Sequence, residues 1–314
     1  MGGPGALLVA VWVLGFAGSV ALRIGAFNIQ SFGDRKASDP ACGSVIAQLF
    51  DLTTPPPDPG WLRHHACAGG AGPRPERCHN TLGADQQRVQ ARVQLCEQQA
   101  AGSGPIQGDV PVHIQVTREG LQGGACRAQV AGSVDHQYFA PRKDAVSVME
   151  TYQYPDPEDA FSRDPFVVKF SAPTCAAKEL VLIPLHAAPH QAVSEIDALY
   201  DVYLDVINKW DTDDMLFLGD FNADCNYVRA EDWAAIRLRS SEVFKWLIPD
   251  SADTTVGNSD CAYDRIVVCG AHLRRSLKPH SAAVHDFQEE FGLDQDQALC
   301  VSDHFPVEVT FKSH

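Results

Sequence analysis

The sequence MLFLGDFNAD, residues 215–224, carries the strongest chemical signal in this chain. Its apolar part predicts a buried strand, and Asp220 and Asn222 follow at the carboxyl end of that strand. Alternate residues of a strand point to the same side, so we expect these two side chains to lie together. A carboxylate beside a carboxamide suits a hard divalent cation and a phosphate oxygen.

Other polar side chains stand at the ends of apolar runs in the same way. Asn28 and His186 each follow such a run, Asp264 precedes one, and Asp303 with His304 precedes another. A His near a carboxylate suits general acid–base chemistry, in which the imidazole moves a proton and the carboxylate orients it. A single His or Asp at such a place is most often structural. The hypothesis of a catalytic site therefore depends on all of them occurring together.

The elements that must position these residues are short strands and one helix. An amphipathic run at 192–208 has its apolar residues at helical spacing. Strands mixed with a helix indicate an α/β protein. The predicted strands are 22–29, 146–154, 166–172, 181–186, 215–221, 265–270 and 307–311.

Composition indicates a folded protein and limits how it could meet nucleic acid. The chain has 314 residues, of which 45% are hydrophobic and 21% charged, as in globular proteins. Its formal net charge of −15 excludes a protein that holds nucleic acid by bulk basic charge. It leaves open an enzyme that meets phosphate groups through bound cations.

The N-terminus predicts a secreted protein. An apolar run at 6–17 is too short to span a bilayer, and Ser19 and Ala21 stand at −3 and −1 of a cleavage site before Leu22. We therefore expect a signal peptide at about 1–21. The alternative is a buried first strand or helix. No later stretch reaches 18 apolar residues, so we expect no membrane anchor.

Residues 51–141 differ from the rest of the chain. They hold 12 of the 24 Gly and no Lys, and no strand or helix period persists through them. Such a long stretch without structure is unusual inside a compact domain. We expect it to be irregular.

Several motifs resemble the deoxyribonuclease I family, within the wider endonuclease–exonuclease–phosphatase superfamily. They are AFNIQSFG at 26–33, LHAAPHQAV at 185–193, GDFNADC at 219–225, CAYDRIVV at 261–268 and SDHFPVEV at 302–309. The resemblance implies a single domain from 22 to 314, a four-layer α/β sandwich of two packed mixed sheets with outer helices. It also implies a secreted, divalent-metal-dependent endonuclease that cuts double-stranded DNA to 5′-phosphate ends with little sequence preference. The implied cofactors are Mg²⁺ and Ca²⁺, with Mn²⁺ as an alternative; we expect a monomer, and actin binding is left open.

The resemblance also assigns roles to residues. His186 would protonate the leaving 3′-oxygen, His304 would activate water, and Asp264 would orient His186. The other implied residues are Asn28, Asp220, Asn222 and Asp303 for metal and phosphate, Asp253 and Thr255 for one structural calcium ion, Asp159 and Phe161 for a second, Arg163 and Tyr263 for DNA contact, and Cys225 with Cys261 for a disulfide.

Two family motifs are missing. Family members carry QEVRD, whose Glu binds metal, and a strand of the form YKExYLFxY, whose Glu would orient His304; neither string occurs here. Residues 51–141 occupy their place. Read one nucleotide later with permitted codons, residues 62–115 yield QEVRD and YKEMYLFTY in the family's order. We therefore interpret 62–115 as an out-of-frame exon segment and about 116–141 as retained intron, against the alternative of a divergent insertion.

Two other classes of function share part of the pattern. A phosphatase or sphingomyelinase of the superfamily would also carry Asp220, Asn222 and the Asp303–His304 pair. CAYDR and the signal peptide favour the nuclease. A catalytically impaired, non-enzymatic family member is the second alternative, because both family glutamates are absent from this chain.

Overall fold

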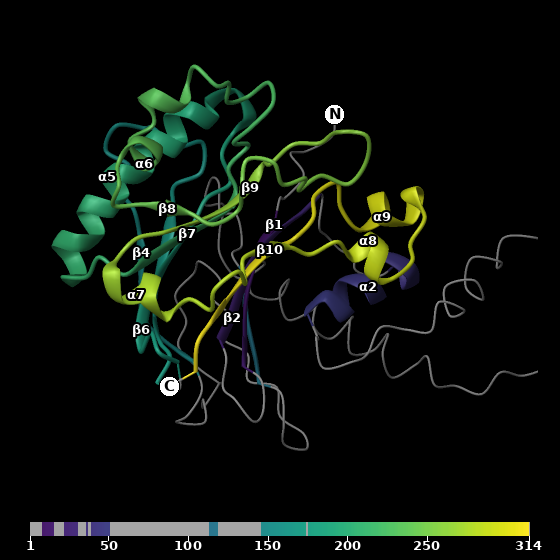
Figure 1. The fold of residues 1–314 in the computed structure, drawn as a ribbon, viewed down its shortest axis with the longest axis horizontal. Helices are drawn as coiled ribbons and strands as arrows, with labels where there is room; N and C mark the ends of the chain where they lie inside the picture. Colours follow the sequence, from purple (N-terminus) through teal and green to yellow (C-terminus); the bar gives the residue numbers. More distant parts are fainter. Residues whose placement is uncertain are drawn as a thin grey trace, which may run out of the picture.

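The computed structural model of this chain describes residues 8–15, 22–30, 36, 39–50, 113–118, 146–173 and 175–313. These residues form two β-sheets that pack face to face, with helices on the outer face of each sheet (Figure 1). The predicted four-layer α/β sandwich is therefore confirmed. None of the helices in the described ranges is long and apolar enough to cross a lipid bilayer.

The first sheet has six strands in the order β4-β5-β6-β7-β9-β8. Alternation along each strand divides its apolar residues between two cores. In β7, Met215 and Phe217 pack toward helix α5, whereas Leu216 and Leu218 pack between the sheets. The strands are β4 (Ser147–Gln153), β5 (Phe166–Ser171), β6 (Glu179–Pro184), β7 (Met215–Asp220), β8 (Lys245–Trp246) and β9 (Asp264–Val268).

The second sheet has five strands in the order β10-β11-β2-β1-β3. In β2, Ile24 and Ala26 face the first sheet, and Phe27 and Ile29 face helices on the opposite side. All four side chains are fully buried. The strands are β1 (Leu8–Gly15), β2 (Leu22–Ile29), β3 (His113–Arg118), β10 (Ala283–Val284) and β11 (Val307–Phe311).

Two strands of the second sheet come from unexpected places. β1 lies within the segment expected to be a signal peptide, and it pairs antiparallel with all eight residues of β2. β3 lies within 51–141, where the sequence predicted no regular structure, and pairs parallel with β1. The expectation was wrong for these six residues: Ile114 and Val116 alternate with polar residues, which is a strand pattern. The rest of 51–141 lies outside the described residues.

Helices cover both outer faces. The predicted helix at 192–208 is confirmed as α5, which lies on the first sheet together with α6 (Figure 1). Helices α2, α8 and α9 lie together beside the second sheet. The helical elements are α2 (Pro40–Phe50), α5 (Ala192–Trp210), α6 (Arg237–Ser240), α7 (Ala271–Ser276), α8 (Phe287–Glu290), α9 (Gln295–Val301) and the 3₁₀ turns η1 (Pro189–Gln191) and η2 (Trp233–Ala235).

Two disulfides join described cysteines. Cys225–Cys261, which the family resemblance implied, is present and closes a loop between β7 and β9. A second bond, Cys42–Cys300, joins α2 to α9 across 258 residues of sequence and was not predicted. Two further described cysteines, Cys175 and Cys269, are buried free thiols; the remaining four lie outside the described residues.

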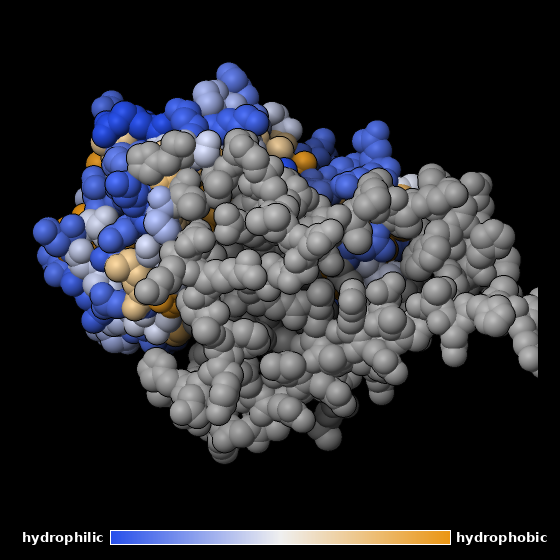
Figure 2. Space-filling view, turned by 90° about the horizontal axis from the view of Figure 1, so that it is seen from below, coloured by the Kyte–Doolittle hydropathy of each residue, from blue (hydrophilic) through white to orange (hydrophobic). Residues whose placement is uncertain are grey.

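The exposed large apolar side chains of the described residues are scattered over the fold. Where described residues are visible on the face shown in Figure 2, the surface is mostly hydrophilic, with small separate hydrophobic spots. The large apolar side chains that are most exposed come from different elements: Met149, Leu204, Val243 and Leu299. Single exposed apolar residues of this kind are normal on soluble proteins.

The Cys42–Cys300 bond gives a prediction about stability. We expect Cys300→Ser to lower the free energy of unfolding by about 2–4 kcal/mol, because an open chain gains conformational entropy when it unfolds. Chemical denaturation measures the change. Peptide mapping without reductant should find Cys42 linked to Cys300 beside the Cys225–Cys261 pair, which serves as the internal control. Free thiols at both Cys42 and Cys300 would contradict the prediction.

Candidate active site

The candidate site lies where strands of both sheets end on one side of the sandwich. β7 ends at Asp220, and the antiparallel strand β9 begins at Asp264, which pairs directly with Asp220. In the other sheet, β2 ends just after Asn28, and His304 stands three residues before the antiparallel strand β11. His186 follows β6 by two residues. Residues distant in sequence therefore meet at one edge.

The buried carboxylate of Asp220 is the centre of this group. Its Oδ2 accepts a hydrogen bond from Asn28 Nδ2 at 2.8 Å, and its Oδ1 accepts one from the backbone N–H of Asn222 at 2.9 Å. The Nε2 atoms of His186 and His304 lie 3.6 and 3.7 Å from the same Oδ2. Asp220 is 2% exposed, so its charge is balanced by protein groups rather than by water.

Gly219 allows the His186 segment to approach β7. A Cβ atom at this position would lie 2.2 Å from the carbonyl oxygen of Leu185, and the φ angle is +133°. Only glycine avoids both problems. The close approach lets the N–H of Ala187 donate to the carbonyl of Asp220 at 3.0 Å.

Asn222 reaches the site differently from the strand alternation we predicted. It lies beyond the end of β7, in a left-handed turn with φ 49°, a conformation that Asn tolerates. Its side-chain Nδ2 donates to the carbonyl of Ala187 at 2.9 Å. Asn222 thus fixes the turn and the His186 segment together.

His304 forms a buried dyad with Asp264. The Nδ1 of His304 and the Oδ2 of Asp264 are 2.6 Å apart, and Asp264 is fully buried. This corrects the predicted role of Asp264, which was to orient His186. The reason is the pairing of the strands. β9 begins at Asp264, beside Asp220, and the loop before β9 pairs with His304 through the isolated bridge between Thr255 and His304.

His186 has a different environment. The structure gives its buried Nδ1 atom no hydrogen-bond partner among the described residues, and its carbonyl accepts a hydrogen bond from Arg163 Nη1 at 3.3 Å. Among the described residues, the imidazole that lacks a carboxylate at Nδ1 is therefore His186, and not His304 as we predicted.

The two imidazoles have opposite pKa shifts. Burial lowers the pKa of His186 to about 4, assisted by the positive charges of Arg163 and His304 and opposed by Asp220. Burial also acts to lower the pKa of His304, but Asp264 and Asp220 outweigh it and raise the pKa to about 10. The carboxylate at Nδ1 makes the difference. Burial raises the pKa of Asp220 itself, against the charges of the two His residues.

The oxygen atoms of the site fit a divalent cation. Buried oxygens of Asn28, Asp264 and Asp303 have no hydrogen-bond partner within the described part of the chain. Ligand atoms of Asp220, Asp264 and His304 lie within 4.8 Å of one another. Carboxylate and amide oxygens are the ligands that Mg²⁺ and Ca²⁺ prefer, and unpaired buried oxygens are otherwise costly. Specific ions remain predictions.

The two residues expected to contact DNA flank the histidines. Arg163 bonds to the His186 carbonyl, as described above, and the ring of Tyr263 has its centroid 6.1 Å from that of His304. Tyr263 also stacks against Tyr227 at 5.4 Å. Both side chains are partly exposed, so they could meet a ligand at the site.

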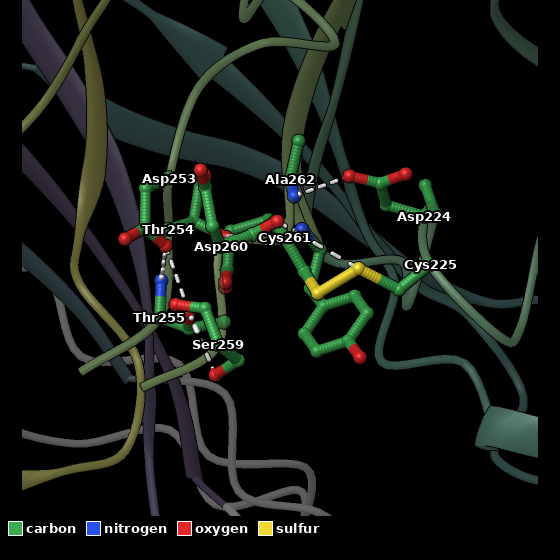
Figure 3. Close-up of a disulfide and its surroundings, with 12 residues drawn as sticks. Asp224, Cys225, Asp253, Thr254, Thr255, Ser259, Asp260, Cys261 and Ala262 are labelled. Atoms are coloured by element: carbon green, nitrogen blue, oxygen red, sulfur yellow. Dashed lines mark hydrogen bonds between the residues drawn. A yellow bond between two sulfur atoms is a disulfide. The ribbon is translucent and has the colours of Figure 1, made fainter. Parts of the chain in front are cut away.

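The residues of the first expected calcium loop lie together beside the disulfide. Thr255 donates its backbone N–H to Asp253 Oδ1 at 2.9 Å, and its hydroxyl lies 2.7 Å from the same oxygen. The loop continues to Cys261, whose disulfide with Cys225 is next to it (Figure 3). Asp224 closes the other side by accepting from the N–H of Ala262 at 2.8 Å.

The second expected calcium loop contains two acidic residues that sequence reasoning missed. Asp159 has a left-handed backbone with φ 54°, and the N–H of Phe161 donates to Asp156 Oδ2 at 2.9 Å. Partial desolvation and then the charges of Asp156 and Asp159 raise the pKa of Asp164. Asp156 and Asp164 lie within six residues of Asp159 in the sequence, and this closeness could have identified them as part of the same loop.

Sequence reasoning also missed three polar residues near the catalytic group. Gln30 donates from Nε2 to Asp303 Oδ2 at 2.8 Å. The hydroxyl of Ser302 accepts from the backbone N–H of His304, and the hydroxyl of Thr254 accepts from that of Asp264. Their places next to motif residues were the only signal in the sequence.

Comparison with known proteins identifies the family of this chain. Residues 135–304 match the sequence profile described as the Endonuclease/Exonuclease/phosphatase family. The chain is 62% identical to Deoxyribonuclease-1-like 2 of Mus musculus and 58% identical to the protein of that name in Homo sapiens, covering all of both chains in each case. It is 42% identical to Deoxyribonuclease-1 of Gallus gallus, over 98% of this chain and 97% of that one. The chain therefore belongs to the endonuclease/exonuclease/phosphatase family and, within it, to the deoxyribonuclease I family.

Proposed function

We propose that this chain is a secreted, divalent-metal-dependent endonuclease that hydrolyses double-stranded DNA to 5′-phosphate ends. The observation that carries the catalytic part is the pair of imidazole Nε2 atoms, 3.6 and 3.7 Å from one buried oxygen of Asp220. Secretion is supported by the apolar run at 6–17 with small residues at 19 and 21. N-terminal sequencing of the protein in culture medium tests it.

Phosphodiester hydrolysis needs one group to take a proton from water and another to give one to the leaving oxygen. His186 and His304 both bring Nε2 close to Oδ2 of Asp220 and can fill these two roles. Asp264 fixes His304 through Nδ1, which leaves Nε2 free to move a proton. Arg163 and Tyr263, beside the two histidines, would hold the DNA backbone, and such contacts position rather than specify.

The residues that would hold the cation are Asn28, Asp220, Asn222 and Asp303. A bound divalent ion there would neutralise charge on the scissile phosphate, which a chain of net charge −15 otherwise repels. Asp220 anchors the group, because both Asn28 and Asn222 bond to it. Gln30 holds Asp303 at the edge.

One observation favours the alternative, a catalytically impaired family member. The buried Nδ1 of His186 lacks a partner among the described residues, and the missing YKExYLFxY motif carries a Glu. We infer that this Glu would bond to His186, giving it a dyad like that of His304 and Asp264. Among the described residues, His186 is held through its backbone carbonyl and by burial.

The first prediction concerns the two histidines. In a version that carries QEVRD and YKEMYLFTY in place of the altered segment, His186→Ala or His304→Ala should reduce plasmid nicking by about 10²–10⁴-fold, because each removes a proton-transfer group. His272→Ala is the matched control, since His272 is exposed and lies by Asp214 on the far strand end. EDTA should abolish nicking, and products should accept a 5′ label only after phosphatase treatment. Full activity in either site variant would remove that residue from the site.

The second prediction compares the chain as written with that restored version. We expect the literal chain to cleave DNA at least about 100-fold more slowly, because an imidazole without its carboxylate loses orientation and stabilisation of its charged form. Initial nicking rates at equal concentrations of folded protein measure the difference. Equal, metal-dependent cleavage by both would show that the altered segment supplies what we consider missing.

The third prediction concerns the calcium loop at 156–164. Calcium binding to the folded chain should raise the melting temperature, and Asp164→Asn should weaken this calcium-dependent rise, since it removes one of three neighbouring carboxylates. Glu242→Gln, at an exposed position, removes one charge away from the loop and is the control. If both variants keep the full calcium-dependent rise, Asp164 takes no part in binding calcium.

A further inference from the structure

The pairing between β2 and β11 stops short of the catalytic residues. The last paired residues are Ala26 and Val307. Beyond them the chain before β11 pairs elsewhere: the N–H of Phe305 donates to the carbonyl of Thr254 at 2.8 Å, and the N–H of Val256 donates to the carbonyl of Asp303 at 2.8 Å. No ladder bond therefore fixes the end of β2 to the His304 segment.

The hydroxyl of Ser302 connects these two segments where the ladder has ended. Its Oγ donates to the carbonyl of Asn28 at 2.6 Å. It accepts from the N–H of Gln30 at 3.3 Å and from the N–H of His304 at 3.3 Å. A hydroxyl offers one donor and two acceptor positions, so these three bonds use its full capacity. Ser302 is fully buried, so bulk solvent does not compete for these three bonds.

Each backbone group that Ser302 binds belongs to a segment that carries a site residue. Asn28 reaches Asp220 with its side chain, Gln30 holds Asp303, and His304 forms the dyad with Asp264. The backbone N–H of His304 faces away from the 254–256 pairing, whose two bonds use residues 303 and 305. Ser302 is thus the one acceptor that the described structure gives this N–H.

We propose that Ser302 is a positioning residue that sets the distance between the metal-binding end of β2 and His304. It acts through backbone groups and touches no substrate. The inference deepens the proposed function and rests on it for its catalytic consequence. The hydrogen bonds themselves can be tested whether or not the chain cleaves DNA.

Besides the exposed side-chain bond between Gln30 and Asp303, two outer contacts keep the same segments near each other but cannot set their alignment. Lys36 Nζ donates to the carbonyls of Gln30 and Val301, and Cys42–Cys300 joins α2 to α9. A lysine side chain is long and can adapt its conformation. The disulfide involves Cys300 near the end of α9, several residues before His304 in the chain. Removal of the Ser302 hydroxyl should therefore leave the segments together and shift them relative to one another.

The experiment measures amide hydrogen exchange by NMR in the full chain. In the wild type, the amides of Gln30 and His304 should be protected, although Gln30 is an exposed residue. Ser302→Ala should raise their exchange rates by at least about tenfold, and the imidazole Nδ1–H resonance of His304 should move. The control is Ser276→Ala, because Ser276 is also buried and its hydroxyl donates only to the carbonyl of His272. That variant should change neither signal.

Rapid exchange of both amides in the folded wild type would overturn the proposal without any variant. So would unchanged rates and an unchanged His304 resonance in folded Ser302→Ala protein. Where the wild type cleaves DNA, kcat of Ser302→Ala should fall about tenfold to a hundredfold with KM for DNA within about twofold. A wild type that does not cleave DNA counts against the proposed function alone, and exchange then decides the role of Ser302.

Discussion

The burial of the Asp220 carboxylate is the constraint on which the site depends. A carboxylate out of contact with water must be surrounded by donors and positive charge, or its desolvation would cost several kcal/mol. Here the donors come from both sheets: Asn28 from β2 and the turn at Asn222 from β7 itself. The two imidazoles complete the surroundings. Because one carboxylate accepts hydrogen bonds from both sheets, through Oδ2 from Asn28 and through Oδ1 from Asn222, it links the two sheets at this edge.

The strand directions explain why these groups converge. β6 and β7 are parallel, so His186 and Asp220 leave the sheet at the same edge. β9 is antiparallel to β7, so its first residue, Asp264, lies beside the last residue of β7. In the second sheet, β11 is antiparallel to β2, so the end of β2 and the start of β11 also lie at one edge. Because Gly219 has no side chain, the His186 segment can approach β7 closely.

The sequence predicted the elements better than the contacts between them. Period-2 runs and the helical run at 192–208 correspond to strands and to α5, because local burial sets these patterns. The pairing of Asp264 with His304 was not predictable, since it depends on register between segments 40 residues apart. The Cys42–Cys300 bond spans 258 residues, and cysteine spacing alone does not give connectivity. The resemblance supplied the residues of the site, and the structure shows which of them bond to one another, as with Asp264 and His304.

The two histidines show how strongly a single carboxylate changes the pKa of a buried imidazole. Both side chains are about 90% buried, with 10% and 11% exposed, and both lie near the same oxygen of Asp220. Yet the pKa of His304 is raised to about 10 and that of His186 is lowered to about 4. Asp264 at Nδ1 accounts for the contrast, because a buried imidazolium is stable only where a negative partner replaces water. Within the described part of the chain, the site therefore pairs one of its two histidines with a carboxylate at Nδ1. A carboxylate placed at Nδ1 of His186 would raise its pKa toward that of its neighbour.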